Sequence, residues 1–437
     1  MKSALPAVGA LLASTMLLML VQSCAEPKAE APINILLITV DTLRTDHVGS
    51  YGGPVPTPAM DRLAAEGVLV DGACTPTPST GPAHASLMSG LYVWNHGILL
   101  NAVPMDDPEL PNLAEILQNA GFDTGAFVSS FNVDQRWGFG RGFKTFHFEP
   151  TQELMEKAFW SRGEATTTRT LDWIGGRDDR PFFAWIHYFD PHRPYQPPAD
   201  FARPASETVD LAHKSVPPKA RSMEHLEAMI RAYRGEVAYT DAQIGRLLDG
   251  LAEAGRLDDT LIVLTSDHGE GLGDHQLLEH GWNLYDELVT VPLLLRGPGL
   301  PQGLRLTGDA QLEDLMPTIL SLAGVDKPSA LDGVDLAPWL SGQSTDSPRD
   351  GVLGRRAAFP DEPALFFERR GHSKWIGELD HGGQVFHLRR DPKELTPRDV
   401  STLPDALRQS LVDLRAAPKD RVLDEESRKA LEALGYL

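Results

Sequence analysis

Acidic and histidine residues stand directly after three apolar runs of the sequence. The runs cover residues 33–40, 181–188 and 261–265, and the polar groups at their ends include Asp41, His187, Asp190, His192, Asp267 and His268. Runs of this composition are typical of strands buried on both faces of a parallel sheet. Ligands of such sheets bind outside the carboxyl ends of the strands, where carboxylates and imidazoles together form a set of metal ligands. One aspartate at a strand end is often only a helix cap, so the prediction of a metal site depends on all three groups occurring together.

A hydroxyl group stands in a position to act as a nucleophile. Residues 79–86 read Ser-Thr-Gly-Pro-Ala-His-Ala-Ser, and Pro82 suits the first turn of a helix, which places Thr80 near the helix N-terminus. The free N–H groups and the partial positive charge of a helix N-terminus stabilise an alkoxide and a tetrahedral anion. Thr80 is therefore the candidate nucleophile, and the alternative is that it only caps the helix.

Strands and helices alternate along most of the chain, which predicts an α/β domain with a mainly parallel sheet. Strands are expected at 33–40, 68–70, 123–129, 181–188, 261–265 and 291–295, and helices at 58–67, 83–90, 113–120, 165–173 and 223–254. After about residue 350, short apolar stretches separated by turn residues predict a small antiparallel sheet, with a closing helix at 425–434. We expect a catalytic domain at 34–345 and a small C-terminal α+β subdomain at 346–437.

Composition excludes several classes of protein. The 437 residues carry 40 Lys and Arg against 61 Asp and Glu, a net charge of −21, and 42% of them are hydrophobic. This balance excludes a largely disordered chain and argues against a nucleic-acid partner, which needs a dense basic face. The two cysteines, Cys24 and Cys74, exclude a disulfide scaffold and a cysteine-rich zinc site.

The first residues predict export from the cytoplasm. Lys2, the apolar stretch 4–21 and the small residue before Cys24 have the order of a signal peptide over residues 1–23. A cysteine at this point resembles the lipidation site of bacterial lipoproteins, with 24–33 as a tether. We expect a protein of the bacterial cell envelope that is attached to a membrane through Cys24; simple cleavage to a free mature protein is the alternative.

Ordered motifs along residues 34–339 resemble the sulfatase branch of the alkaline phosphatase superfamily. The motifs are Val40–Arg44, Thr57–Ala64, Pro82–Gly90, His187–His192, Ser266–Glu270, His280-Gly281 and Leu284–Glu287. The resemblance implies helices on both faces of the sheet and the hydrolysis of ester bonds.

The sequence departs from that family at three positions. Typical members carry Cys-x-Pro-x-Arg and oxidise the cysteine, or a serine in its place, to formylglycine. Ten residues before Gly90 this chain has Thr80, which cannot be oxidised to formylglycine, and His84 stands in place of the arginine. Thr42 replaces the second aspartate of the family, after Asp41. Cys74 begins a Cys-x-Pro sequence but lacks the arginine, so no formylglycine is expected.

The resemblance implies a role for each candidate residue. One divalent ion, Ca, Zn or Mn, is held by Asp41, Asp267, His268 and the Thr80 oxygen. His192 and His280 bind the oxygens of the ester or protonate the leaving group. His84 and His187 support the site or contact the substrate.

The substrate class stays open at this point. The family favours sulfate esters, whereas a threonine nucleophile favours phosphorus, and the substrate is a small molecule, a glycan or a lipid. Thr80 and the spacing of His280, twelve residues after His268, are similar to phosphoethanolamine transferases, so a phosphodiesterase or such a transferase is one alternative. An inactive lipoprotein that binds anionic glycans is the other.

Overall fold

The computed structural model describes residues 33–148, 160–212, 214–217, 220–359 and 362–412. The expected signal peptide, Cys24 and the closing helix expected at 425–434 lie outside these residues. The described residues from Ile33 onward form one unit in the pattern of their contacts.

The centre of this unit is a sheet of eight strands, and most neighbouring strands in it are parallel. Their spatial order is β10 (Leu304–Gln311), β2 (Val68–Cys74), β9 (Leu293–Arg296), β6 (Thr260–Ser266), β1 (Asn34–Val40), β5 (Phe182–Tyr188), β3 (Asp123–Val128) and β4 (Thr145–His147). Strand β9 is antiparallel to both neighbours, and all other pairs are parallel. The predicted fold class is therefore confirmed, with one antiparallel strand inside the sheet.

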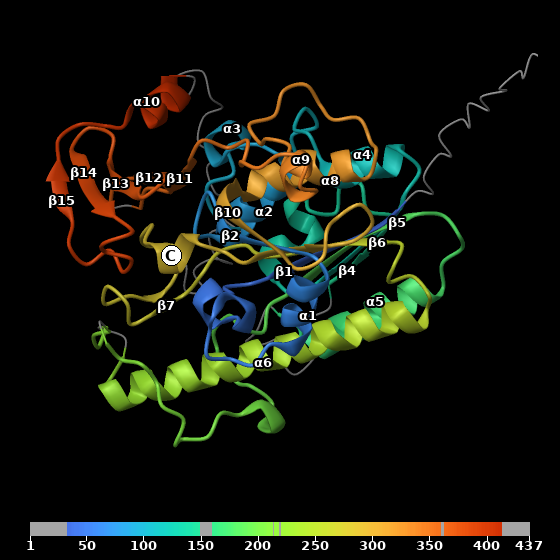
Figure 1. Cartoon of the computed structure of the whole chain (residues 1–437), viewed down its shortest axis with the longest axis horizontal. Coiled ribbons are helices and arrows are strands. Elements are labelled where there is room, and N and C mark those ends of the chain that lie inside the picture. Colours follow the sequence, from blue (N-terminus) through green and yellow to red (C-terminus); the bar gives the residue numbers. More distant parts are fainter. Residues whose placement is uncertain (1–32, 149–159, 213, 218–219, 360–361, 413–437) are drawn as a thin grey trace, which may run out of the picture. The chain divides into compact units, whose positions relative to one another are not determined.

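Helices cover both faces of the sheet (Figure 1). One face carries α1 (Pro58–Glu66), α5 (Gly163–Gly175) and α6 (Met223–Glu253), and the other carries α2 (Thr80–Ser89), α4 (Leu113–Asn119), α8 (Leu315–Leu322) and α9 (Ala337–Leu340). Strand β1 shows why its sequence is apolar throughout. Ile35 and Leu37 pack into the core on the α2 side, and Leu36 and Ile38 pack into the core on the α6 side.

A second sheet follows the catalytic part of the chain. Its five antiparallel strands are β11 (Val352–Arg356), β12 (Leu365–Arg370), β13 (Ser373–Glu378), β14 (Gly382–His387) and β15 (Arg398–Val400), in sequence order. The helix α10 (Asp405–Val412) comes after them. Phe367 and Ile376 of this sheet share an apolar cluster with Leu284, the first residue of the motif Leu284–Glu287, and with Leu288, which follows that motif.

Short elements connect these parts. They are α3 (Val93–His96), α7 (Asp286–Val289), β7 (Gly271–Leu272), β8 (Leu278–Glu279) and the 3-10 turns Thr45–His47, Gly49–Tyr51, Phe131–Val133, Gln135–Trp137, Ala199–Phe201 and Leu312–Asp314.

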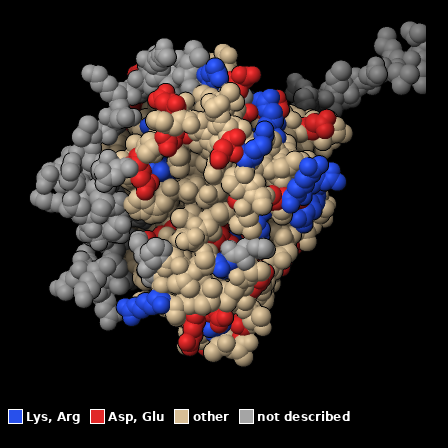
Figure 2. Space-filling model, turned by 90° about the vertical axis from the view of Figure 1, so that its left-hand side faces the viewer, with Lys and Arg blue, Asp and Glu red and all other residues tan. Residues whose placement is uncertain are grey.

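Acidic and basic side chains are mixed on the face shown in Figure 2. Within the described ranges, no helix has the length and apolar character needed to cross a membrane.

Candidate active site

Three neighbouring strands bring the predicted acidic and histidine residues together. Strand β1 is flanked by β5 and β6, both parallel to it, so the carboxyl ends of the three strands meet at one edge. Asp41 follows β1, His187 lies near the end of β5, and Asp267 and His268 follow β6. All four side chains are fully buried.

Thr80 faces this edge from the first position of α2. Its Oγ1 lies 3.3 Å from Nε2 of His268. The other ring nitrogen of His268, Nδ1, lies 2.9 Å from the Gly269 carbonyl oxygen, which can only accept a hydrogen bond. The neutral His268 ring therefore carries its proton on Nδ1 and turns the lone pair of Nε2 toward Thr80.

The helix N-terminus differs from the sequence prediction in one respect. We expected free N–H groups beside Thr80, but the N–H of Gly81 donates to Oδ1 of Asn101 at 2.7 Å, and Pro82 has no N–H. The amide of Gly81 is therefore already used inside the protein. The helix start presents the Thr80 hydroxyl and the partial charge of the helix, but not a row of free donors.

The two aspartates have oxygens without hydrogen-bond partners. Oδ1 of Asp267 accepts from the N–H groups of Thr42 and His268, at 3.2 and 2.8 Å, whereas its Oδ2 and both oxygens of Asp41 are buried and unpartnered. Burial raises the pKa of Asp41 well above its usual range, with further contributions from Asp267 and Glu270, and burial raises the pKa of Asp267 to about 6. Buried, unpartnered carboxylates are the donors that a divalent cation requires, so these residues fit the expected metal ion.

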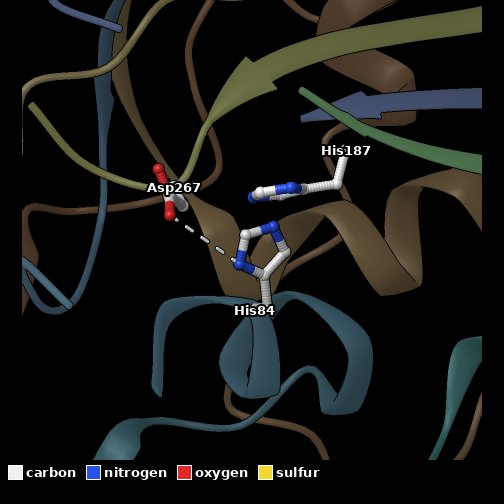
Figure 3. Close-up of side chains that lie close together, drawn as sticks. All are labelled: His84, His187 and Asp267. Carbon is white, nitrogen blue, oxygen red and sulfur yellow. Dashed lines mark ion pairs between the residues drawn. The ribbon is translucent and has the colours of Figure 1, made fainter. Parts of the chain in front are cut away.

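Two further histidines lie beside Asp267 (Figure 3). His84 comes from α2 and His187 from β5, their ring centres are 5.1 Å apart, and Nδ1 of His84 lies 3.9 Å from Oδ2 of Asp267. His84 also bonds the Thr80 carbonyl through Nδ1, at 2.8 Å, and Oγ1 of Thr39 through Nε2, at 3.0 Å. Both nitrogens of His187 lack a hydrogen-bond partner. The sequence analysis gave His84 and His187 the same role, whereas in the structure only His84 has hydrogen-bond partners at both ring nitrogens.

His192 and His280 complete the group on the other side of His268. The ring centre of His280 lies 4.3 Å from that of His268 and 4.9 Å from that of His192. Burial lowers the pKa of His192 to about 3 and that of His280 to about 4, so both rings are neutral near pH 7 when no anion is bound. The structure therefore brings together every residue that the sequence proposed for the site.

Sequence reasoning missed the residues that orient this group. Oε1 of Glu270 lies 3.2 Å from Nδ1 of His280, and its Oε2 accepts from the Tyr195 hydroxyl at 2.9 Å. Glu270 was visible in the motif that ends β6, whereas Tyr195, Asn101 and Thr39 gave no signal, because their contacts come from chain segments far apart in the sequence.

The surroundings of Cys74 differ from those of the polar group around Thr80 and His268. Its side chain is fully buried in an apolar cluster with Leu288, Val289 and Phe367, and burial raises the pKa of its thiol to about 11. The thiol is therefore protonated, and its neighbours in this cluster are apolar side chains.

Comparison with known proteins identifies the family. The family model described as Sulfatase matches residues 33–325. A multifunctional alkaline phosphatase superfamily protein of Trinickia caryophylli is 30% identical over an alignment of 398 positions that covers 70% of this chain and 77% of that protein. A choline-sulfatase of Rhizobium meliloti is 28% identical over an alignment of 461 positions that covers 89% of this chain and 87% of that protein.

Solved structures support the same assignment at the level of the fold. The phosphonate monoester hydrolase of Agrobacterium radiobacter superposes with a TM-score of 0.75 at 24% identity, covering 88% of this chain and 95% of that one. A protein solved in complex with its substrate D-glucosamine-2-N,6-O-disulfate superposes with a TM-score of 0.73 at 21% identity. The match covers 90% of this chain and 100% of that one. The chain therefore belongs to the sulfatase family and is a hydrolase of ester bonds.

Proposed function

We propose that the protein is a metal-dependent hydrolase that cleaves sulfate esters or singly charged phosphorus esters through a covalent ester of Thr80. The observation that supports this most is the position of the Thr80 hydroxyl. It lies 3.3 Å from Nε2 of His268, in a group whose Asp41 and Asp267 oxygens are buried and unpartnered. Cys74, the residue that a formylglycine enzyme would need, lies in an apolar cluster instead.

Asp41, Asp267, His268 and Thr80 are the residues that would hold the cation. When bound, a divalent ion lowers the pKa of a hydroxyl group and offsets the charge of the carboxylates. The N–H groups that bond Oδ1 of Asp267 fix that carboxylate, and the Gly269 carbonyl fixes the tautomer of His268. The chain thus holds the donors in place before any ion binds.

The reaction then needs two displacements at sulfur or phosphorus. In the first, the Thr80 hydroxyl gives up its proton to solvent and its oxygen forms a bond to that atom; the bond to the leaving oxygen breaks, and that oxygen takes a proton from His280 in the protonated form that binding of the anionic ester favours. In the second, water attacks the Thr80 ester and gives a proton to neutral His280, and the bond to Thr80 breaks as the Thr80 oxygen takes up a proton from solvent. Glu270 orients His280 for both proton transfers through its 3.2 Å contact with Nδ1. His192, 4.9 Å from His280 between ring centres, is placed to bind an oxygen of the ester.

The charge of the site favours a substrate with one negative charge. The four histidines at its edge, His84, His187, His192 and His280, all have lowered pKa values because they are buried, so they are neutral. The nearby cation Arg193 is paired with Glu279. The proposed metal ion offsets the charges of Asp41, Asp267 and the Thr80 oxygen, so no cation among the described side chains of the site remains to match a second charge on the substrate. Like charges roughly 4 Å apart cost about 4 kcal/mol at an effective dielectric constant of 20.

A substrate panel tests the reaction class. Aryl sulfate, phosphate diester, phosphonate monoester and phosphate monoester, each assayed with added Zn, Mn or Ca, distinguish the alternatives. We expect kcat/KM for the doubly charged phosphate monoester to be lower than for the best singly charged ester by on the order of 10²-fold or more. Absence of turnover with every ester and every metal would instead favour a binding protein.

Acid quenching tests the covalent step. During turnover of the best substrate, the peptide that carries Thr80 is expected to gain the mass of one sulfate or phosphoryl group, and the same peptide from a Thr80→Ala variant is not. Turnover without this added mass would contradict the covalent mechanism.

A further inference from the structure

We propose that His187 is a direct ligand of the metal ion, in place of the second aspartate that Thr42 replaces, and that the resulting site selects a zinc-like transition metal over calcium. This inference rests on the proposed function in one point, namely that the Asp41 and Asp267 group binds a divalent cation.

The surroundings of His187 provide the first argument. Its side chain is fully buried at the end of β5, and neither Nδ1 nor Nε2 has a hydrogen-bond partner. An unpartnered polar group in the interior carries a desolvation cost of about 1–3 kcal/mol, which native proteins retain where the group has another use. The atoms nearest its Nε2 include Oδ2 of Asp41, at 3.5 Å, which is also unpartnered.

Distances between donor atoms provide the second argument. Donors bound to one tetrahedral ion at about 2.0–2.2 Å lie roughly 3.3–3.6 Å from one another. Nε2 of His187 lies 3.5 Å from Asp41, Nε2 of His268 lies 3.5 Å from Oδ2 of Asp267, and the Thr80 hydroxyl lies 3.3 Å from His268. Nε2 of His268 also lies 3.9 Å from Oδ1 of Asp41, slightly beyond this range, so three of these four contacts already have the spacing of donors that share one ion.

His84 is the competing candidate, because it also lies within reach of Asp267 and His187. Its hydrogen bonds exclude it as a ligand. Nδ1 donates to the Thr80 carbonyl, and Nε2 accepts the Thr39 hydroxyl proton, so no lone pair of the neutral ring is free. Of the two histidines in Figure 3, His187 alone has a nitrogen available.

The residue at the family's second aspartate position, Thr42, supports the replacement of that aspartate by His187. Thr42 has a left-handed backbone, with φ of 55°, and its carbonyl accepts a hydrogen bond from the Tyr233 hydroxyl at 2.9 Å. Its N–H bonds Asp267, and its own hydroxyl has no partner. Thr42 thus holds the Asp267 carboxylate through its backbone, and the missing carboxylate is replaced by an imidazole from the next strand.

The donor set indicates the metal. Calcium prefers six to eight oxygen ligands, whereas imidazole nitrogen suits zinc and related transition metals. Two imidazoles, from His187 and His268, beside two carboxylates and the Thr80 oxygen give two nitrogen and three oxygen donors, a mixed set rather than the all-oxygen set that calcium prefers. The site is therefore matched to a zinc-like ion.

The test measures metal binding rather than activity. Metal-free wild type, His187→Leu and His84→Leu are titrated with zinc and with calcium by chelator competition, and the melting temperature is recorded with and without metal. These variants form a matched pair, because each removes one buried imidazole and the two rings are neighbours. His187→Gln, which keeps a polar oxygen donor, is the second variant if His187→Leu does not fold.

We expect wild type to bind one zinc per chain and to prefer zinc over calcium. His187→Leu should lose more zinc affinity than the roughly 10–100-fold that loss of a supporting residue costs, and with it most of the thermal stabilisation by zinc. His84→Leu should stay within that range. His187→Gln should lose the preference for zinc over calcium.

Two other outcomes are distinguishable. If wild type binds zinc and Asp41→Asn abolishes binding, but His187→Leu and His187→Gln bind zinc as wild type does, the inference about His187 is overturned and the proposed metal site stands. If wild type binds neither metal, the proposed metal dependence itself fails.

Discussion

The hydroxyl of Thr80 and the thiol of Cys74 occupy contrasting surroundings, and this contrast separates two kinds of chemistry. Thr80 Oγ1 faces His268 at 3.3 Å, whereas Cys74 lies in an apolar cluster with a pKa raised to about 11. The nucleophile is therefore expected to be an unmodified side chain rather than an oxidised cysteine.

Substitution at these two positions tests that expectation. Thr80→Ala should lower kcat by on the order of 10³-fold or more, because the attacking oxygen is removed, and Thr80→Ser should keep part of the activity. Cys74→Ala should change kcat little. Steady-state kinetics with the best ester, together with circular dichroism to check the fold, provide the measurement. Loss of activity in Cys74→Ala with retention in Thr80→Ala would point to a formylglycine enzyme instead.

At the scale of the elements, strand β1 and helix α2 are joined by a chain of hydrogen bonds. The indole N–H of Trp185 donates to Oγ1 of Thr39 at 3.0 Å, Thr39 faces Nε2 of His84 at 3.0 Å, and Nδ1 of His84 donates to the Thr80 carbonyl at 2.8 Å. We call these residues the Trp185–Thr39–His84 chain. It fixes the first residue of α2 relative to the sheet.

Thr39→Val is expected to weaken this connection while leaving the shape of the side chain. His84 loses its partner at Nε2, so Thr80 is held less firmly and kcat should fall by about tenfold, with KM and zinc affinity little changed. Thr265→Val is the matched control, because Thr265 is also a buried strand threonine but its hydroxyl bonds the Ser266 carbonyl. Equal effects of the two substitutions on kcat would show that the chain has no positioning role.

Much of the fold could be predicted from local patterns, because strands buried on both faces have continuous apolar sequences. The runs at 33–40, 181–188 and 261–265 match β1, β5 and β6. Strand β4 is only three residues long, and β10 is mostly half-exposed, so neither carries that pattern. The antiparallel direction of β9 depends on how the chain returns to the sheet, which its sequence does not encode locally.

The candidate site was predictable for a different reason. Asp41, Asp267 and His268 follow strands whose order determines that they meet, so their residue types at strand ends were informative. The distinction between His84 and His187 was not predictable, because it depends on which side chains from other segments bond each ring. The contacts of His275 were not predictable either, since its ring stacks on Tyr285 with ring centres 3.6 Å apart and its Nδ1 lies 2.7 Å from Oε1 of Glu287.

For the molecule as a whole, buried ion pairs link the C-terminal sheet to the catalytic part of the chain. Lys374 in β13 is fully buried, and its Nζ contacts Asp286 at 2.6 Å and Glu394 at 2.9 Å. Asp286 begins α7, a few residues after His280. The second sheet thus supports the segment that carries one of the proposed catalytic histidines.

Lys374→Met should destabilise the protein by about 3–5 kcal/mol, because it leaves the buried Glu394 and the half-buried Asp286 without their shared cation. Lys393→Met, at an exposed position, should change the free energy of unfolding by less than about 0.5 kcal/mol. Urea denaturation of both variants measures the difference. A change in Lys374→Met no larger than that of the control would show that the ion pairs contribute little.

The location of the protein in the cell is also a property of the whole molecule, and attachment to a membrane stays a prediction. The apolar stretch 4–21 followed by Cys24 motivates a lipid anchor on the mature protein. Expression of the full chain in a bacterial host should place it in the membrane fraction, and Cys24→Ala should release it. Equal solubility of the two forms would contradict the anchor.

The Trp185–Thr39–His84 chain also has a consequence for the route of protons. Its first member is an indole N–H, which does not ionise near neutral pH, and Thr39 has only one proton to share between His84 and the Ile186 carbonyl. The chain can hold Thr80 in place but cannot conduct a proton away from it. In the proposed reaction, protons are therefore exchanged at His280, which contacts Glu270 through Nδ1, and not through this chain.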